Sequence, residues 1–324
     1  MREIVIKQAN AGQKALKFVK SYLKDAPLSF IYKLFRKKDV KVNNHWVKED
    51  FLLKENDVVR IYVTDEQLED FLRPKSAIKK DLPYPIIYED KNILLINKPA
   101  GVMVTSDGNE NNLTLAQEVI NYLYFKGEYS PEEGGFTPAP AHRLDRNTSG
   151  LILFGKNDAS LKCLTLAFKN HENICKTYLS LVKGNVFNKG KIDKPLKKEA
   201  NRSLVHVASI REGGKEALTL YEPKENYEEG YSLLSINLLT GRTHQIRVHL
   251  ASISHPVVGD RKYGDFATNK IFKERFGLNY QLLHAYSISF DSLMEPLSYL
   301  SKKTFIAPLS PQFTKILSSM KKVS

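Results

Sequence analysis

The stretch "AHRLDRNTSGLILFGKN", residues 141–157, places a carboxylate on a tight turn directly before an apolar run. The Thr-Ser-Gly at 148–150 is turn-forming, and its glycine can adopt the positive φ that other residues resist. The run at 151–154 is continuously apolar and ends at a glycine, which predicts a buried strand. Asp145 is therefore expected just before the start of a core strand, between two arginines in the sequence. Taken alone, it is most simply a turn aspartate that binds its own backbone.

The chain around this stretch favours an α+β fold. From residue 86 onward, short apolar runs at 93–99, 177–184 and 231–241 are separated by turns, and helical patterns occupy 158–169 and 244–253. No glycine-rich phosphate loop follows any of these runs. We therefore expect a mixed, mostly antiparallel central sheet flanked by helices, and not a doubly wound parallel sheet.

The composition is typical of a soluble globular protein. Hydrophobic residues make up 42% of the 324 residues and charged residues 26%. The first residues lack the apolar region of a secretory signal, and no run approaches the ~18 apolar residues of a membrane span. Cys163 and Cys175 are too few for a disulfide framework or a zinc site. We expect a cytoplasmic monomer that is not associated with a membrane.

The net charge of +13 indicates a polyanionic partner, which is either nucleic acid or an anionic membrane surface. Residues 1–63 contain 14 Lys and Arg against 7 Asp and Glu, so about half of the excess lies in the first fifth of the chain. A solvated surface does not account for this concentration. The N-terminal segment is therefore the expected contact for the partner.

This N-terminal segment predicts two short helices followed by a small sheet. The first helix spans 14–24, and the second begins at Ser29 as its N-cap and runs to residue 38. Asn43-Asn44 is expected to form a hairpin turn, and 57–63 the last strand. Residues 12–63 resemble the αL-type module shared with ribosomal small-subunit protein four, which presents a basic helix and a hairpin to folded RNA. The resemblance implies that RNA contacts the exposed side of the second helix, at Lys33, Arg36 and Lys37.

Two further stretches gather polar residues beside apolar ones. "KTYLSLVKG", residues 176–184, places Tyr178 in a predicted strand. "GRTHQIRVHLASISHPVVGDRKYG", residues 241–264, predicts a helix capped by Thr243, from which Arg247 projects beside the apolar stripe. Individually, Tyr178 is an ordinary strand residue and Arg247 an ordinary salt-bridge residue.

We predict no metal site. His244 and His249 are the best candidate ligands, but their spacing of five places them on different helix faces, and no acidic ligand lies between them.

Together these motifs resemble the RluA-type family of RNA pseudouridine synthases. The signature H-R-L-D-x-x-T-S-G is complete at 142–150, and "NKPAGVMVT" at 97–105 resembles the strand and loop that enter the active-site region. "KTYLSLVKG" resembles the tyrosine strand, the 241–264 stretch the arginine helix and its following loop, and "FGLNYQLLHAYSISF" at 276–290 a block of the RluC-like subgroup. Asn147 replaces a second Asp that is common in the family. After Phe290, "DSLMEPLSYLSKK" replaces the usual histidine-proline ending.

The resemblance implies an RNA-binding module at 1–63 and a pseudouridine synthase domain at 86–324. Residues 64–85 are polar and charged and contain three prolines, which predicts a linker between them. Asp145 would be the catalytic carboxylate, Arg247 its salt-bridge partner, and Tyr178 the residue that packs against uracil and helps to remove the proton from carbon five. The target base must be flipped out of its RNA, and Arg143, beside His142, would contact the opened RNA.

This isomerisation requires no cofactor, metal or energy source. The RluC-like block implies large-subunit ribosomal RNA as the target.

Two other function classes fit parts of the sequence. One is a non-catalytic RNA-binding or ribosome-assembly factor, against which the joint presence of Asp145, Tyr178 and Arg247 argues. The other is a glycosidase-like hydrolase, which usually needs two facing carboxylates. Only one carboxylate has a signature context here, so the sequence favours an RNA pseudouridine synthase.

Overall fold

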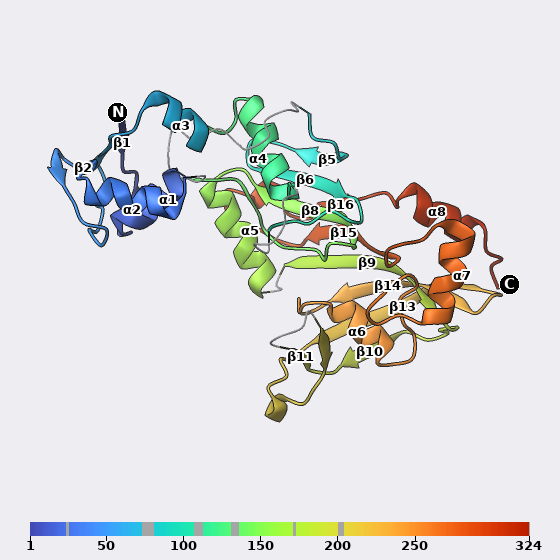
Figure 1. The fold of residues 1–324 in the computed structure, drawn as a ribbon. Coiled ribbons are helices and arrows are strands. Elements are labelled where there is room, and N and C mark those ends of the chain that lie inside the picture. Colours follow the sequence, from blue (N-terminus) through green and yellow to red (C-terminus); the bar gives the residue numbers. More distant parts are fainter. Residues whose placement is uncertain are drawn as a thin grey trace. The chain divides into compact units, whose positions relative to one another are not determined.

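A computed structural model describes residues 1–23, 26–72, 81–106, 113–130, 136–170, 173–199 and 204–323. The chain divides into two compact units (Figure 1). The N-terminal unit comprises Met1–Pro83 and Leu115–Ala139, and the sheet unit comprises Tyr84–Thr114 and Pro140–Ser324. Each unit is described by itself.

The N-terminal unit contains a four-stranded sheet in the order β1-β4-β2-β3. Its strands are β1 (Arg2–Val5), β2 (Val40–Val42), β3 (His45–Trp46) and β4 (Val58–Ile61). Its helices are η1 (Gln8–Asn10), α1 (Ala15–Tyr22), α2 (Leu28–Arg36), α3 (Asp65–Leu72) and α4 (Leu115–Phe125). The two predicted helices and the hairpin are confirmed. β1 is an addition, because four residues are too few for a periodic signal; it pairs antiparallel with β4.

The predicted hairpin turn between β2 and β3 is present, and the predicted N-cap of α2 is not. Asn43 and Asn44 both have positive φ, 49° and 71°, which is the geometry that a two-residue hairpin turn favours. The predicted cap at Ser29 is wrong: Pro27 occupies the N-cap position, with no side-chain capping bond. Proline fixes the extended backbone from which α2 begins, so Ser29 lies within the first helical turn.

The core of this unit includes three apolar residues of α2. Ile31, Leu34 and Phe35 are buried, and Lys33, Arg36 and Lys37 are exposed on the same helix and at its end. The helix α3 occupies the first part of the segment 64–85, where the sequence predicts a linker. Its Leu68 is buried in the same core, and its Phe71 ring lies 4.9 Å from that of Phe30. Residues 73–80 of the segment lie outside the described residues.

The sheet unit is built on a ten-stranded mixed sheet whose main path is β10-β13-β14-β9-β15-β8-β6-β5. β8 and β15 pair in parallel, and the other pairs on this path are antiparallel. The expected mixed, mostly antiparallel sheet is therefore confirmed. The strands are β5 (Ile86–Glu89), β6 (Ile93–Lys98), β7 (Ala139–Pro140), β8 (Ser149–Gly155), β9 (Ile174–Lys183), β10 (Gly190–Asp193), β13 (Leu218–Tyr227), β14 (Tyr231–Leu238), β15 (Leu283–Phe290) and β16 (Thr304–Ile306), with a separate hairpin of β11 (Leu196–Lys198) and β12 (Val205–Val207).

Helices and hydrophobic clusters support both halves of this sheet. The helices are α5 (Asp158–Asn170), η3 (Ile210–Glu212), α6 (Gln245–Ala251), α7 (Phe266–Phe276), η4 (Ser298–Leu300) and α8 (Pro311–Ser318). One cluster joins α5 to β6 and β8, with Phe168 and Leu153 among its members. A second joins α7 and α8 to β9 and β14, with Phe272 and Leu181 among its members. The predicted helices at 158–169 and 244–253 are confirmed, although α6 ends at Ala251.

The segment after Phe290, which departs from the family pattern, extends the sheet instead of leaving it. Its strand β16 pairs antiparallel with β15. Phe305 on β16 lies 5.0 Å from Tyr88 and 6.3 Å from Phe290, measured between ring centroids. This edge therefore has aromatic packing of its own.

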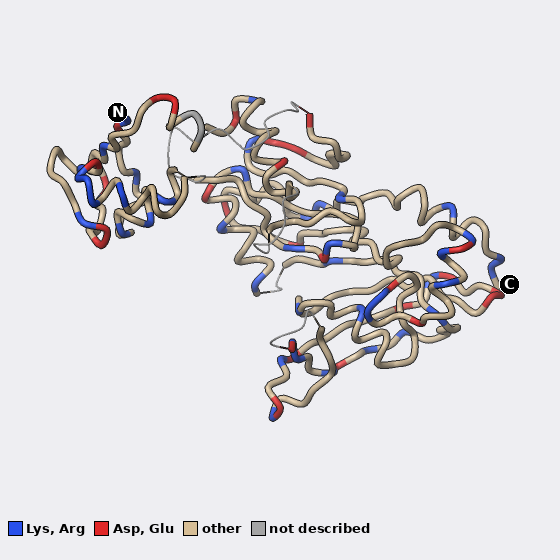
Figure 2. The backbone as a smooth tube through the Cα atoms, in the orientation of Figure 1, with Lys and Arg blue, Asp and Glu red and all other residues tan. Residues whose placement is uncertain are grey.

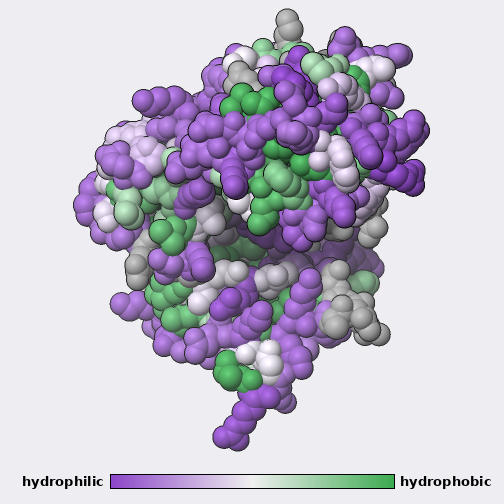
Figure 3. Space-filling view, turned by 90° about the vertical axis from the view of Figure 1, so that its left-hand side faces the viewer, coloured by the Kyte–Doolittle hydropathy of each residue, from purple (hydrophilic) through white to green (hydrophobic). Residues whose placement is uncertain are grey.

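Charged residues occur along the backbone of both units, with basic residues prominent in the N-terminal unit (Figure 2). The face in Figure 3 is mainly hydrophilic, with small hydrophobic patches between the polar side chains. No helix within the described residues is long and apolar enough to cross a membrane.

Candidate active site

The signature loop 142–150 lies where β8 meets the middle of the sheet. Gly150 pairs with Ala285 on β15, and Ala285 pairs with Tyr178 on β9. β15 therefore lies between β8 and β9, with the start of β8 on one side and the middle of β9 on the other. Gly150 has a φ of +110°, and a Cβ there would lie 2.2 Å from the carbonyl oxygen of Ala285. Only glycine fits this position, which explains the last residue of the signature.

Asp145 lies in the turn that leads into β8. Its carbonyl accepts the backbone N–H of Thr148 at 3.1 Å, and the buried hydroxyl of Thr148 accepts a bond from the Gln281 amide at 3.2 Å. The next residue, Ser149, hydrogen-bonds His284 through its hydroxyl at 2.8 Å. Side chains on β15 and just before it therefore hold the loop in place. The Asp145 side chain remains 26% exposed.

A buried lysine stabilises the signature loop through hydrogen bonds to backbone carbonyls. The ammonium of Lys98, at the end of β6, donates to the carbonyls of Pro99, Val102 and Arg146 at 2.9–3.0 Å. Burial lowers the pKa of Lys98 to about 7, and the negative charge of Asp145 opposes this shift. Arg146 itself donates from Nε to the carbonyl of Gly101. Of the two arginines beside Asp145, Arg146 thus ties the signature loop to the 98–102 loop.

Arg247 on α6 lies between two carboxylates. Its Nη1 donates to Asp145 Oδ2 at 2.9 Å, and its Nε and Nη2 form a bidentate pair with Asp260 at 2.6 and 2.8 Å. The Asp260 side chain is fully buried, and that of Arg247 is 7% exposed. Burial alone would lower the pKa of Arg247, but the bonds and charge of Asp260, with those of Asp145, raise it above its ordinary value. The guanidinium is therefore permanently charged and held rigidly.

Two aromatic groups complete the surroundings of this arginine. The guanidinium carbon lies 5.1 Å from the ring centroid of Tyr263, whose hydroxyl is 2.8 Å from His244 Nδ1. His244 Nε2 lies 3.9 Å from Asp145 Oδ2. Burial lowers the pKa of His244, although Asp145 opposes the shift, so its ring is neutral at pH 7.

The start of α6 differs from the expectation that Thr243 caps the helix. His244 is the N-cap residue, in the left-handed conformation and without a capping side-chain bond. The Gln245 side chain instead reaches back, so that its Oε1 accepts the N–H of Arg242 at 3.0 Å and the hydroxyl of Thr240 at 2.8 Å. The predicted Thr243 cap is therefore wrong, because a side chain within the helix already satisfies the turn.

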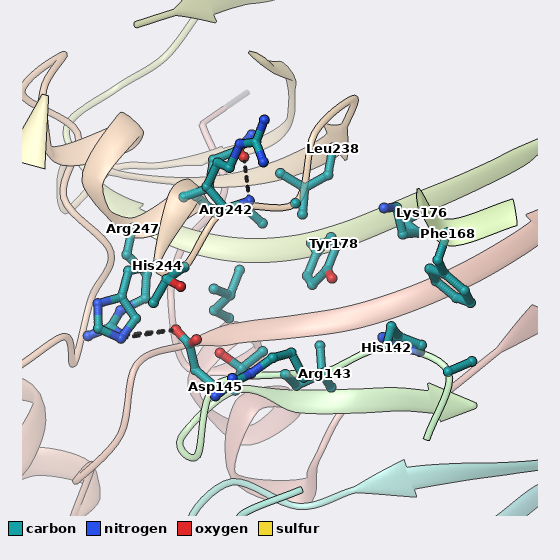
Figure 4. A pocket seen from close by; sticks show the side chains of 18 of the residues that line it. His142, Arg143, Asp145, Phe168, Lys176, Tyr178, Leu238, Arg242, His244 and Arg247 are labelled. Atoms are coloured by element: carbon teal, nitrogen blue, oxygen red, sulfur yellow. Dashed lines mark hydrogen bonds and ion pairs between the residues drawn. The ribbon is translucent and has the colours of Figure 1, made fainter. Parts of the chain in front are cut away.

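Tyr178 and Asp145 line the same pocket, whose volume is about 450 Å³. Figure 4 shows Tyr178 on its strand between the Asp145–Arg247 pair and a second group of side chains. The tyrosine is 7% exposed. Burial, followed by the negative charge of Asp145, raises the pKa of its hydroxyl far above the ordinary value. Its phenol therefore remains protonated at neutral pH.

The other end of the pocket holds His142, Phe168 and Lys176 (Figure 4). His142 stacks on Phe168, with ring centroids 4.4 Å apart, and its Nε2 accepts the backbone N–H of Leu153 at 3.2 Å. Burial, aided by the charge of Lys176, lowers the pKa of His142 to about 3. His142 is therefore a neutral support of the loop. Arg143 also lines the pocket and is exposed.

Five of the predicted site residues line one pocket: Asp145, Arg143, Tyr178, Arg247 and, at its other end, His142. The three predicted RNA-binding residues of α2, Lys33, Arg36 and Lys37, belong to the N-terminal unit. Four residues close to Asp145 or Arg247 were not predicted from the sequence: Lys98, Asp260, Tyr263 and His244, whose ring lies near the Asp145 carboxylate. All four lie within motifs already quoted. The sequence gives no sign that Asp260 pairs with Arg247, because the pairing depends on how the chain folds back after α6.

The histidines considered as metal ligands have other partners. His249 is 2.8 Å from the Thr219 hydroxyl through Nδ1 and 2.9 Å from the Lys194 carbonyl through Nε2. Among the residues that the structure describes, no group of three or more His, Cys, Asp or Glu side chains is placed to share a metal ion.

Two human proteins of solved structure share the fold at low sequence identity. RNA Pseudouridylate Synthase Domain Containing 4 matches with a TM-score of 0.57 and 20% identity, covering 72% of this chain and 91% of its own. RNA Pseudouridylate Synthase Domain Containing 1 matches with a TM-score of 0.50 and 22% identity, covering 74% and 97%.

Relatives of higher identity cover nearly the whole chain. A "ribosomal large subunit pseudouridine synthase C" from Vibrio parahaemolyticus is 33% identical over 97% of this chain and 95% of its own. Another of the same name, from Pasteurella multocida, is 32% identical over 99% and 94%. An "uncharacterized RNA pseudouridine synthase" from Mycoplasma capricolum is 31% identical over 94% and 97%. The family model described as RNA pseudouridylate synthase matches residues 92–252, a range that contains every residue lining the pocket except Leu283 of β15. The chain therefore belongs to the RNA pseudouridylate synthase family and is an isomerase that converts uridine in RNA to pseudouridine.

Proposed function

We propose that Asp145 is the catalytic carboxylate of this pseudouridine synthase, that Arg247 and Tyr178 act beside it, and that the substrate is large-subunit ribosomal RNA. The observation that carries the assignment is the Asp145–Arg247 ion pair of 2.9 Å in a pocket that also contains Tyr178. A turn aspartate with a purely structural role would direct its side chain to its own backbone. Asp145 instead presents a partly exposed carboxylate to a buried cation.

The reaction has a simple atom balance. The bond from ribose C1′ to uracil N1 breaks, a bond from C1′ to C5 forms, and one proton moves from C5 to N1 in net terms. An ionised carboxylate beside the sugar can attack C1′ or remove a proton from the ribose. Burial disfavours the charged form of a carboxylate, and a fixed guanidinium favours it. Arg247 supplies this charge, while Asp260 fixes its position through two of its three donating nitrogens.

Tyr178 is suited to pack against the uracil ring. Its phenol is protonated at neutral pH because burial and the charge of Asp145 raise the pKa of the hydroxyl. A protonated phenol is a poor base, so the electrostatics favour ring packing and hydrogen-bond donation over removal of the C5 proton. His244, neutral and 3.9 Å from Asp145, is a second candidate for proton movement.

RNA binding would use both units. A stacked base cannot reach the pocket, so the target nucleotide must leave its helix. Arg143 is exposed at the pocket beside Asp145 and would contact the RNA backbone, with His142 fixing the loop beneath it. Lys33, Arg36 and Lys37 would contact folded RNA from an αL-like module at residues 1–63. The exposed basic side of α2 beside a hairpin supports this second contact.

The first test is Asp145→Asn. The amide is nearly isosteric with the carboxylate but is a very poor nucleophile or base, so we expect no isomerisation. RNA affinity should stay within about tenfold, or ~1.4 kcal/mol, of the unchanged protein. Folding should be largely preserved, because Asp260 continues to pair with Arg247. The measurement is pseudouridine formed in a single turnover at saturating enzyme, alongside a thermal melt. A folded variant with an unchanged rate would refute the assignment of Asp145.

The second test concerns the target. The names of the relatives support ribosomal RNA of the large subunit. Site-resolved pseudouridine mapping of ribosomal and transfer RNA should show a large-subunit site that is lost without the protein. That site should return with the unchanged protein and remain absent with Asp145→Asn. Loss confined to transfer RNA would contradict the proposed target and leave the proposed chemistry intact.

A further inference from the structure

A second pocket of about 450 Å³ lies in the N-terminal unit, between the β2–β3 hairpin and the loop that follows it. Two buried valines, Val42 and Val47, line it, with exposures of 3% and 7%. Trp46 and Phe51 contribute aromatic surface, and His45 and Lys48 contribute polar groups. The pocket is therefore apolar at its base and polar at its rim.

The aromatic groups of this pocket are unusually open to solvent. Trp46 is 47% exposed and Phe51 39% exposed. A tryptophan side chain is highly buried on average, so an indole left half exposed beside a pocket has surface available to a partner. Trp46 lies on β3, the edge strand of its sheet, and pairs with Lys41 of β2. Strand pairing therefore holds the indole in place without covering it.

Lysines lie in this pocket and beside it. The Lys38 ammonium lies 5.0 Å from the centroid of the Trp46 ring, and the Lys41 ammonium lies 5.0 Å from that of Tyr62. Lys48 lines the pocket, as does one acidic residue, Asp50. Aromatic surfaces interleaved with cations are the arrangement with which proteins stack unpaired bases and contact the phosphates between them. A neutral apolar peptide would not require these cations.

We propose that this pocket binds an unpaired nucleobase of the RNA substrate, which stacks on Trp46 while neighbouring phosphates contact Lys38 and Lys48. The proposal rests on RNA binding by the N-terminal unit, as put forward above, and adds a distinct subsite to it. The basic side of α2 recognises phosphates alone, whereas a stacking subsite requires a base that is not paired. The enzyme would thereby favour RNA that has a single-stranded nucleotide in addition to the target uridine.

Trp46 is the only tryptophan of the chain, so its fluorescence reports this site alone. The full-length protein is titrated with a short single-stranded oligoribonucleotide and with an abasic oligomer that has the same sugar-phosphate backbone. Binding of each is measured independently by fluorescence anisotropy of a label on the oligomer. We expect quenching of the tryptophan by the base-bearing oligomer and little by the abasic one. Equal quenching by both, or binding of the base-bearing oligomer without quenching, would overturn the proposal.

Variants give a second, independent readout. Trp46→Ala should weaken binding of RNA with an unpaired segment by about tenfold or more, and Trp46→Phe by only about threefold, because a phenyl ring still stacks. Phe187→Ala, which removes an aromatic side chain of 69% exposure in the sheet unit, is the matched control and should change little. Equal losses for Trp46→Ala and Phe187→Ala would contradict the subsite.

The test separates this subsite from the proposed chemistry. Its readouts are RNA affinity and tryptophan fluorescence, which require no turnover at the Asp145 pocket, and Trp46 does not line that pocket. Failure of the Asp145 assignment would leave the fluorescence result unchanged. A Trp46→Ala variant that binds RNA normally but reacts slowly would count against a binding role for Trp46.

Discussion

At the scale of single residues, one guanidinium is shared by two carboxylates of unequal exposure. Asp260 is fully buried and takes two of the nitrogens of Arg247, and Asp145 is partly exposed and takes the third. The buried partner fixes the direction in which the third nitrogen points. Asp260 is thus a positioning residue, and Arg247 is the group through which it acts on Asp145.

This arrangement predicts two separable effects of Arg247→Met. Activity should fall by at least about a hundredfold, which corresponds to the loss of one preorganised charge interaction. The variant should also lose ~3–5 kcal/mol of stability, because Asp260 remains buried without its partner. Adding Asp260→Asn removes that charge and should restore much of the stability but not the activity. Urea unfolding and single-turnover rates measure the two effects, and a double variant that recovers activity would refute the role of the guanidinium.

His142 predicts a pH dependence of stability. Burial and the charge of Lys176 lower its pKa to about 3 in the folded state, from an ordinary value of 6.5. Between these two values the unfolded chain binds a proton that the folded chain does not, so stability decreases as pH falls through this window. The contribution of His142 is fully present above about pH 6.5. The slope from one such group is at most about 1.4 kcal/mol per pH unit.

The matched variant is His142→Gln, whose amide oxygen can accept the N–H of Leu153 and does not titrate between pH 3 and 7. Urea unfolding at several pH values should give a shallower acid slope for the variant than for the unchanged protein. Identical slopes would show that His142 binds a proton as readily in the folded state as in the unfolded chain, which would contradict the lowered pKa.

At the scale of elements, strands and helices with strong local patterns were predictable, and their ends were not. The apolar run at 151–154 lies in β8, all seven residues of which are buried. The caps at Ser29 and Thr243 failed because Pro27 and Gln245 satisfy those ends differently. The three site residues singled out in the sequence do share one pocket. The partner of Arg247 was not predictable, since side-chain pairing across a loop has no periodic signature.

Gly150→Ala tests the contact between β8 and β15. The added Cβ would lie 2.2 Å from a backbone oxygen, and the residue would keep a positive φ. We expect a loss of roughly 3 kcal/mol or more in stability, together with lower activity, because the strand that leads from Asp145 must shift.

Gly230→Ala is the control for this substitution. It also has a positive φ, but nothing lies within 4 Å of its Cβ position. It should cost only ~1–2 kcal/mol, from backbone strain alone. Urea unfolding compares the two variants, and equal losses would mean that the close approach to Ala285 is relieved without cost.

At the scale of the whole molecule, the excess positive charge extends to the pocket, where Asp145 is the one acidic residue among the described residues of the lining. The cationic side chains of the lining are Arg143, Lys169, Lys176, Arg242 and Arg247. The remainder of the net charge of +13 lies outside this pocket. General attraction would bring RNA to the protein quickly, and specific contacts would decide its register.

Replacing Lys33, Arg36 and Lys37 by Gln should weaken RNA binding while preserving the single-turnover rate at saturating enzyme. With three phosphate contacts removed, binding releases fewer counterions. The slope of log affinity against log salt should therefore become shallower by about 2–3. These side chains are exposed, so the fold should be unaffected. Salt titrations of binding measure the effect.

A charge-matched control distinguishes local contact from overall attraction. Lys270, Lys273 and Arg275 are exposed on α7, and their replacement by Gln removes the same charge. This control should change the slope less. Equal changes in the two triple variants would contradict a specific RNA contact at α2.

The single parallel pairing in the sheet has a wider consequence. β8 and β15 are joined in register at only two residue pairs, His284 with Ser149 and Ala285 with Gly150. Asp145 precedes the strand on one side of this seam, while Tyr178 and Arg247 belong to elements on the other. Asp145 and its proposed partners therefore meet only when both sides of the sheet are joined. We therefore expect activity only when the whole sheet is folded. Neither side of it would be active as a separately folding part.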